Sequence, residues 1–101
     1  MPVKTRLEAA EHVGMLPSEE ELRGRIALDA GDLQSRLALA ELGIARADYT
    51  LALSELLEIT RRDRIFRDDI GRRRMLAVFD MAAVQPDLVA DFRNRLSQVL
   101  F

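Results

Sequence analysis

The residues most able to do chemistry are gathered between Arg61 and Arg74, a segment with seven arginines and three aspartates. Arginine side chains can bind a phosphate backbone or an acidic protein surface. The aspartates dilute this positive field, because at helical spacing Asp63 could pair with Arg67 and Asp69 with Arg73. We therefore rank local pairing first, contact with an acidic protein second and nucleic-acid binding third. The candidate protein-contact residues are Arg61, Arg62, Arg64, Arg67 and Arg73.

No other residues form a recognisable catalytic or metal-binding set. The chain has no cysteine, which removes a thiolate nucleophile and a sulfur metal site. His12 is the single histidine, and with only Glu8 and Glu11 beside it this position is a poor metal site. The run 19–21 of three glutamates is explained by a helix dipole and an N-terminal cap. The sequence thus predicts no catalytic residue, no cofactor and no metal, and we expect that the protein is not an enzyme.

The composition is that of a globular helical chain. Hydrophobic residues make up 49% and charged residues 32% of its 101 residues, and no apolar stretch reaches the roughly 18 residues of a membrane span. Ala, Leu, Arg and Glu dominate, which favours helix. The absence of cysteine and of a secretory signal leads us to expect a cytoplasmic protein. Residues 1–60 carry 6 basic and 11 acidic side chains, whereas residues 61–101 carry 9 and 6, so the second half is basic.

Apolar residues recur at helical spacing along almost the whole chain, and cap signals divide the pattern into about six helices. The first is expected over residues 3–13. Ser18, with Glu21 three residues on, has the spacing of a capping box for a helix whose inner side carries Leu22, Ile26 and Leu28. The later helix starts are marked by Asp32, Asp48, Asp68 or Asp69, and Pro86. Turns this short require antiparallel neighbours, so the sequence predicts an all-α fold of helix hairpins.

Residues 33–64 resemble one tetratricopeptide unit, a helix–turn–helix of about 34 residues. The matching positions are Leu39 and Ala40 in the first helix, Ala47-Asp48-Tyr49 at the turn, and Ala52 and Leu56 in the second helix. Ala40 and Ala52 would let the two backbones approach, and Tyr49 would pack over the joint. The unit departs from the pattern where Arg36 replaces an aromatic residue, Gly43 a tyrosine and Arg64 the closing proline.

The second half extends this likeness. After the first repeat come Arg72-Arg73, an apolar helix ending in Phe79, the run Phe92-Arg93-Asn94-Arg95-Leu96, and the terminal Leu100-Phe101. In this order the chain resembles, from Pro17 to Phe101, the C-terminal tetratricopeptide domain of the YbbN-type thioredoxin-like proteins, the chaperedoxins. The resemblance implies a short right-handed array of stacked hairpins, with Phe79, Phe92, Arg72 and Arg93 in structural positions. We expect either arginine to bridge the last two helices through Asp80 or Asp91.

The resemblance also implies a role and a domain layout. Members of that family are bacterial cytosolic co-chaperones of the stress response, in which the helical part follows a thioredoxin-like domain and contacts proteins. We therefore expect residues 1–101 to be one helical domain of a longer protein, with 3–13 the end of a preceding repeat and 68–101 the last helix pair. Its expected partner is the chaperonin or an unfolded client.

Two alternatives stay open at this point. One is an adaptor for nucleic acid or an acidic protein, using segment 61–74. The other is an architectural domain that spaces or dimerises a neighbouring domain. The stripe formed by Leu7, Ala10 and Val13 would lack a partner helix, which predicts self-association of the isolated chain.

Overall fold

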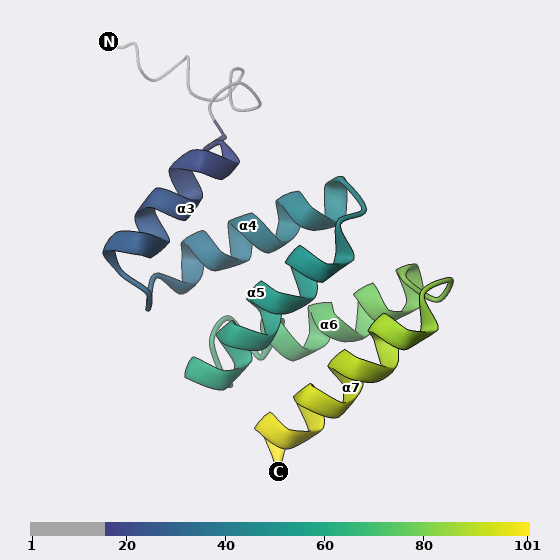
Figure 1. Cartoon of the computed structure of the whole chain (residues 1–101). Helices are drawn as coiled ribbons and strands as arrows, with labels where there is room; N and C mark the ends of the chain where they lie inside the picture. Colours follow the sequence, from purple (N-terminus) through teal and green to yellow (C-terminus); the bar gives the residue numbers. More distant parts are fainter. Residues whose placement is uncertain (1–15) are drawn as a thin grey trace, which may run out of the picture.

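The computed structural model describes residues 16–101, which form five α-helices and no strand (Figure 1). The helices are α3 (Glu19–Leu28), α4 (Leu33–Ala45), α5 (Tyr49–Arg62), α6 (Ile70–Met81) and α7 (Pro86–Leu100). The all-α expectation is thus confirmed for this part of the chain, with one helix fewer than the six expected. The remaining helix, expected over residues 3–13, lies outside the described residues, as do His12 and the stripe of Leu7, Ala10 and Val13. None of the five helices is long and apolar enough to cross a membrane.

Local sequence signals set most of the helix starts. At α3 the Glu21 N–H donates to Ser18 Oγ over 3.1 Å, and the Ser18 N–H donates to Glu21 Oε1 over 2.8 Å, which confirms the capping box. Asp32 and Asp48 cap α4 and α5, each accepting a backbone N–H from three residues on. Pro86 is the first residue of α7. These four starts lie where the sequence predicts them.

The start of α6 differs from the expected cap. Asp69 takes the N-cap position, but its side chain caps no backbone N–H and instead accepts from Arg72 Nε over 2.6 Å. The reason is the backbone, because Arg67, Asp68 and Asp69 all have left-handed φ angles of 49°, 63° and 63°. Arg73 holds this turn by donating from Nε to the Asp68 carbonyl over 2.8 Å and from Nη2 to the Arg67 carbonyl over 3.3 Å.

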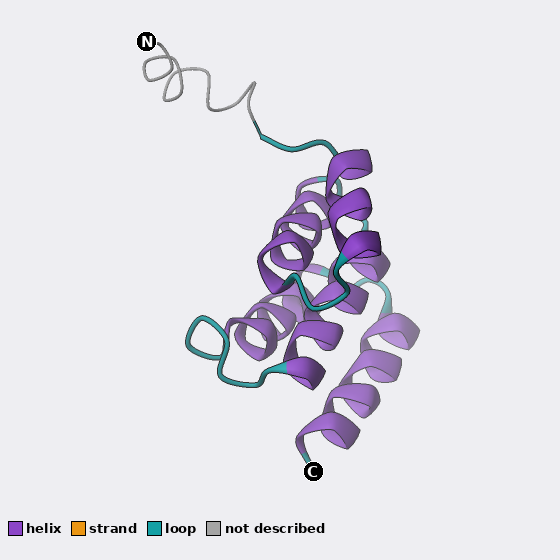
Figure 2. Cartoon of the chain, turned by 90° about the vertical axis from the view of Figure 1, so that its left-hand side faces the viewer, coloured by secondary structure: helices purple, strands orange, loops and turns teal. Residues whose placement is uncertain are grey.

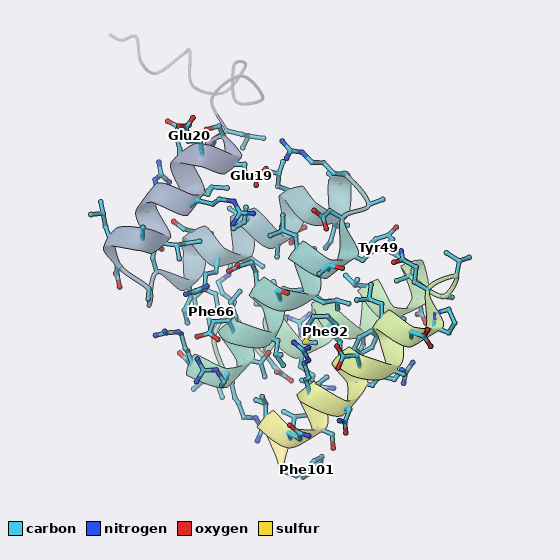
Figure 3. All side chains as sticks on the ribbon, viewed as in Figure 1. Glu19, Glu20, Tyr49, Phe66, Phe92 and Phe101 are labelled. Atoms are coloured by element: carbon cyan, nitrogen blue, oxygen red, sulfur yellow. The ribbon has the colours of Figure 1, made fainter. Side chains whose placement is uncertain are left out.

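The helices follow one another in a zigzag and form two layers, with α4 and α6 in one and α3, α5 and α7 in the other (Figures 1 and 2). Helix α5 is central, because it packs against α4, α6 and α7. The core between the layers contains Leu37, Ala40, Leu53, Leu56, Ile59, Ile70, Met75, Val78, Phe79, Phe92 and Leu96. Phe92 points from α7 into this core, whereas Phe101 extends from the end of the chain (Figure 3). The right-handed twist expected of the array stays a prediction.

Leu28 is the clearest error among the predicted inner residues. Leu22 is buried and Ile26 is half-buried, but Leu28 is 91% exposed. Leu22 and Ile26 are one helical turn apart and share a face, while Leu28 is two residues further on and points to the opposite side. The prediction placed Leu28 inside because it is apolar, although its spacing does not fit the stripe.

Candidate protein-interaction surface

The joint between α4 and α5 depends on three small residues. Ala40 and Ala52 are completely buried where the two helices cross. A Cβ atom at Gly43 would lie 3.0 Å from the Ala52 backbone N and 3.0 Å from the Asp48 carbonyl oxygen. No larger residue fits there without displacing the start of α5, which explains why glycine stands where the repeat pattern has tyrosine.

The turn of this hairpin is also tight. Ala47 has a left-handed φ of 58°, at the position where the repeat pattern usually has glycine. Its N–H donates to the Ile44 carbonyl, and the Asp48 N–H reaches back to the Gly43 carbonyl over 2.8 Å. Tyr49 follows and packs half-buried against the core. The turn thus holds α4 and α5 in close contact.

The other residues predicted as structural fall into two groups. Six of them are buried, with at most 3% of their surface exposed: Leu39, Ala40, Ala52, Leu56, Phe79 and Phe92. Arg72 and Arg93 behave differently from the expectation. Arg72 pairs with Asp69 on its own helix start and does not reach α7. Arg93 does link the last two helices, but through the face of the Phe79 ring, whose centroid is 5.0 Å from the guanidinium carbon, and not through Asp80 or Asp91.

Two contacts between helices escaped the sequence analysis. Gly71 on α6 lies directly against Thr60 on α5, which is buried and donates its hydroxyl to the Leu56 carbonyl over 3.0 Å. Arg36 on α4 pairs with Glu55 on α5 over 2.8 Å, with 12% and 15% of their side-chain surfaces exposed. The available signals were a glycine inside a helical pattern and an arginine at the place of an aromatic residue. Neither signal identifies the residue that Gly71 or Arg36 contacts, because that residue lies on another helix.

The arginine-rich segment is extensively paired, though not as predicted. Arg61 and Arg62 both bind the Glu58 carboxylate, each at 2.5 Å. Burial raises the pKa of Glu58, but the hydrogen bonds from these two arginines outweigh it and leave the pKa lowered. Glu58 is therefore held ionised between two guanidinium groups.

The predicted pairs Asp63–Arg67 and Asp69–Arg73 do not form. Arg67 Nη1 donates instead to Gln34 Oε1 on α4 over 3.0 Å. Asp63 accepts from the Ile65 N–H over 3.2 Å, and Arg73 binds carbonyl groups of the turn. The expected pairing used helical spacing, whereas residues 63–69 form a turn with left-handed φ angles at 67–69, so side chains four apart do not meet there, and Asp69 binds Arg72 instead.

A groove lies between α5 and α7, and it brings together arginines from distant parts of the sequence. Its volume is about 510 Å³. The residues that line this α5–α7 groove are Leu57, Thr60, Arg61, Arg64, Arg95, Gln98 and Val99. Of the candidate contact residues, Arg61 and Arg64 line it, whereas Arg62, Arg67 and Arg73 do not. Arg95 was not among the candidates, since only the packing of α7 on α5 places it there.

The three arginines of the groove differ in their bonding. Arg61 is held by Glu58, as described above. Arg95 donates to Asp91 from Nε over 3.2 Å and from Nη2 over 3.0 Å, and its guanidinium lies 4.9 Å from the Phe92 ring centroid. Arg64 makes no hydrogen bond or ion pair with any residue of the described part of the chain. The groove therefore offers two fixed guanidinium groups and one without a partner among residues 16–101.

A second hollow, of about 370 Å³, lies between α3 and α4. Six of its seven lining residues are apolar: Leu16, Pro17, Leu22, Ala38, Leu42 and Ala45. It ends at the border of the described residues, so no occupant is assigned to it. Among residues 16–101 no three His, Cys, Asp or Glu side chains are grouped so that they could hold a metal ion.

Comparison with known proteins agrees with this architecture. A family model described as "Tetratricopeptide repeat" matches residues 13–101. No curated protein and no solved structure matched the chain.

Proposed function

The chain belongs to the tetratricopeptide repeat family, and from this premise we propose that it is the docking part of a thioredoxin-like co-chaperone that contacts the chaperonin or its unfolded clients. Domains of this family generally mediate protein–protein interaction and are typically non-catalytic. The observation that carries the proposal is the match of residues 13–101 to the tetratricopeptide repeat family, together with the α4–α5 hairpin whose joint is closed by buried small residues. The thioredoxin-like context comes from the order of motifs between Pro17 and Phe101.

The layout of the longer protein belongs to the same proposal. In this proposal residues 1–101 are one helical domain, and residues 3–13 are the end of a preceding repeat. A thioredoxin-like domain upstream of this domain supplies any redox chemistry. The protein works in the cytoplasm, as do the co-chaperones that it resembles.

The bonding of the arginines favours a protein partner over nucleic acid. Most of the guanidinium groups between Arg61 and Arg74 bind a carboxylate, an amide or a backbone carbonyl of this chain. A phosphate backbone requires a row of cations that are free to replace its counterions. Here the carboxylates that pair with Arg61, Arg62, Arg72 and Arg74 neutralise part of that row, so nucleic-acid binding stays the weaker reading.

Affinity capture tests the proposal. The full chain, immobilised through its N-terminus, is exposed to bacterial lysate at low and at high salt, and the captured material is identified by mass spectrometry. We expect the chaperonin at both salt concentrations, since apolar docking is weakened little by salt. Capture of nucleic acid alone, or of no specific protein once salt is raised, would contradict the proposal and favour the adaptor or the architectural role.

A further inference from the structure

We propose that the α5–α7 groove binds a protein segment that carries carboxylate side chains next to an apolar one. This inference rests on the proposed function, since it assumes that the module docks proteins, and it adds the surface and the chemistry of the partner. The observations that carry it are the lining of the groove and the bonding of its arginines.

The lining combines an apolar floor with cationic walls. Leu57 and Val99 are half-buried, so part of each side chain remains open to an incoming apolar group. Thr60 is buried beneath them, with its hydroxyl already donated to a backbone carbonyl. No carboxylate and no aromatic residue lines the groove. An apolar side chain with acidic neighbours therefore complements it in both shape and charge.

Arg61 and Arg95 are held in place before any partner arrives. Each uses Nε and Nη2 to bind a carboxylate of its own helix, Glu58 for Arg61 and Asp91 for Arg95. A guanidinium has five N–H donors, so three remain in each case, the two on Nη1 and one on Nη2. Fixing the side chains in advance lowers the entropy that binding must remove. These two arginines are suited to orient carboxylates of a partner.

Arg64 supplies the charge that the groove does not neutralise. It has no hydrogen-bond or ion-pair partner among the described residues. Only 2 carboxylates, Glu58 and Asp91, are bound by the arginines at this end of α5 and α7. These arginines number 4: Arg61, Arg62, Arg64 and Arg95. The excess is positive. A carboxylate from a partner would form a charge-assisted hydrogen bond with Arg64, the strongest kind that an exposed side chain can offer.

A single nucleic-acid strand fits the groove less well. Proteins that bind such strands stack the bases on aromatic side chains, and none lines this groove. The Phe92 ring is buried beneath the Arg95 guanidinium, so its face is not open to a base. The apolar floor would also have no counterpart in a phosphate backbone.

The test uses the full chain and short fluorescein-labelled peptides. The probe contains glutamate and leucine. One control peptide has glutamine in place of glutamate, and another has serine in place of leucine. Binding is followed by fluorescence anisotropy, and the position of the bound peptide by the NMR shifts of the Leu57 and Val99 methyl groups. A labelled oligothymidylate of equal length probes nucleic-acid binding.

The matched variants are Arg64→Gln and Arg67→Gln. Both remove one exposed arginine from the same segment, but only Arg64 lines the groove. We expect Arg64→Gln to weaken binding of the acidic peptide about five- to tenfold, and Arg67→Gln to change it less than about twofold. Both control peptides should bind more weakly than the probe, and the methyl shifts should accompany binding.

The inference is overturned if the two variants weaken binding equally, if the methyl groups do not respond, if no peptide binds, or if the oligothymidylate binds more tightly than the acidic peptide. If one of these results is found and the chaperonin is still captured from lysate, the chain docks through another surface and the proposed function stands. If neither the acidic peptide nor the chaperonin binds, both the inference and the proposed function are wrong.

Discussion

Gly71 and Thr60 are in contact where α6 crosses α5, and there is no space for a side chain between them. A Cβ atom at position 71 would overlap Thr60 Oγ1 and would lie 3.0 Å from the Leu56 carbonyl oxygen. Because Thr60 is buried and its hydroxyl is bound to that carbonyl, it cannot turn away without losing the hydrogen bond. This contact fixes how closely the second hairpin can stack on the first.

Gly71→Ala should therefore destabilise the chain by about 1–3 kcal/mol, the usual cost of overpacking. Gly24→Ala is the matched control, since Gly24 also lies inside a helix but a Cβ there would meet nothing within 4 Å. The control should stabilise the chain by about 0.5–1 kcal/mol through the higher helix propensity of alanine. Urea unfolding followed by circular dichroism measures both. Equal effects of the two substitutions would show that the α5–α6 contact is looser than described.

Ala47→Gly should stabilise the chain by up to about 1 kcal/mol. Ala47 has a left-handed φ of 58°, which costs alanine about 1–2 kcal/mol but glycine almost nothing, and the greater freedom of glycine in the unfolded chain offsets part of this gain. As a control, Ala77→Gly changes an exposed residue inside α6 and should destabilise by about 1 kcal/mol. Thermal unfolding of both variants gives the comparison. A lower midpoint for Ala47→Gly would mean that the turn does not strain the alanine.

Arg36 and Glu55 should be coupled in stability. With 12% and 15% of their side-chain surfaces exposed, they are shielded from water, so a double-mutant cycle of Arg36→Gln and Glu55→Gln should give a coupling energy of about 1–2 kcal/mol. The reference cycle is Arg23–Glu19 on α3, an exposed pair, for which we expect less than about 0.5 kcal/mol. A value near zero for the first cycle would indicate that the pair is open to solvent.

Stability should fall in acid. The pKa of Glu21 is lowered from its ordinary 4.5 by the Ser18 N–H and hydroxyl, and that of Asp32 from 3.8 by the Ser35 hydroxyl and N–H. The Glu58 pKa is lowered as well. A carboxyl whose pKa is lower in the folded chain stabilises it above the unfolded pKa, and this contribution is lost as the pH falls through the folded value. The free energy of unfolding should thus decrease once the pH drops below about 4.5.

Urea unfolding at a series of pH values measures this decrease. Asp32→Asn is the control, because asparagine caps a helix as well as aspartate but does not titrate, so the acid-induced loss should shrink. A free energy of unfolding that stays constant between neutral pH and about pH 3 would refute the assignment.

The sequence predicted the features that depend on residues close together in the chain. The capping box of Ser18 and Glu21 and the caps at Asp32 and Asp48 are of this kind. The small residues Ala40 and Ala52 were found because a repeat pattern assigns them a place. What escaped prediction depends on neighbours from other helices, as in the contact between Gly71 and Thr60.

The arginine-rich segment shows the same limit. Pairing at steps of four failed because residues 63–69 form a turn in which residues 67–69 take left-handed conformations. Arg95 could not be assigned to the α5–α7 groove without knowing that α7 packs on α5. Helical periodicity tells which face of a helix is apolar, but it does not tell which charged side chains from separate helices will share one surface.

The most direct test of the central claim is a titration of the full chain with purified chaperonin, followed by the anisotropy of a fluorophore on the chain. The account predicts saturable binding that salt weakens only by the share that the exposed arginines contribute, that persists at high salt, and that is unaffected by added oligonucleotide. Absence of binding at both low and high salt, or its displacement by the oligonucleotide, would contradict a protein-docking role on this partner.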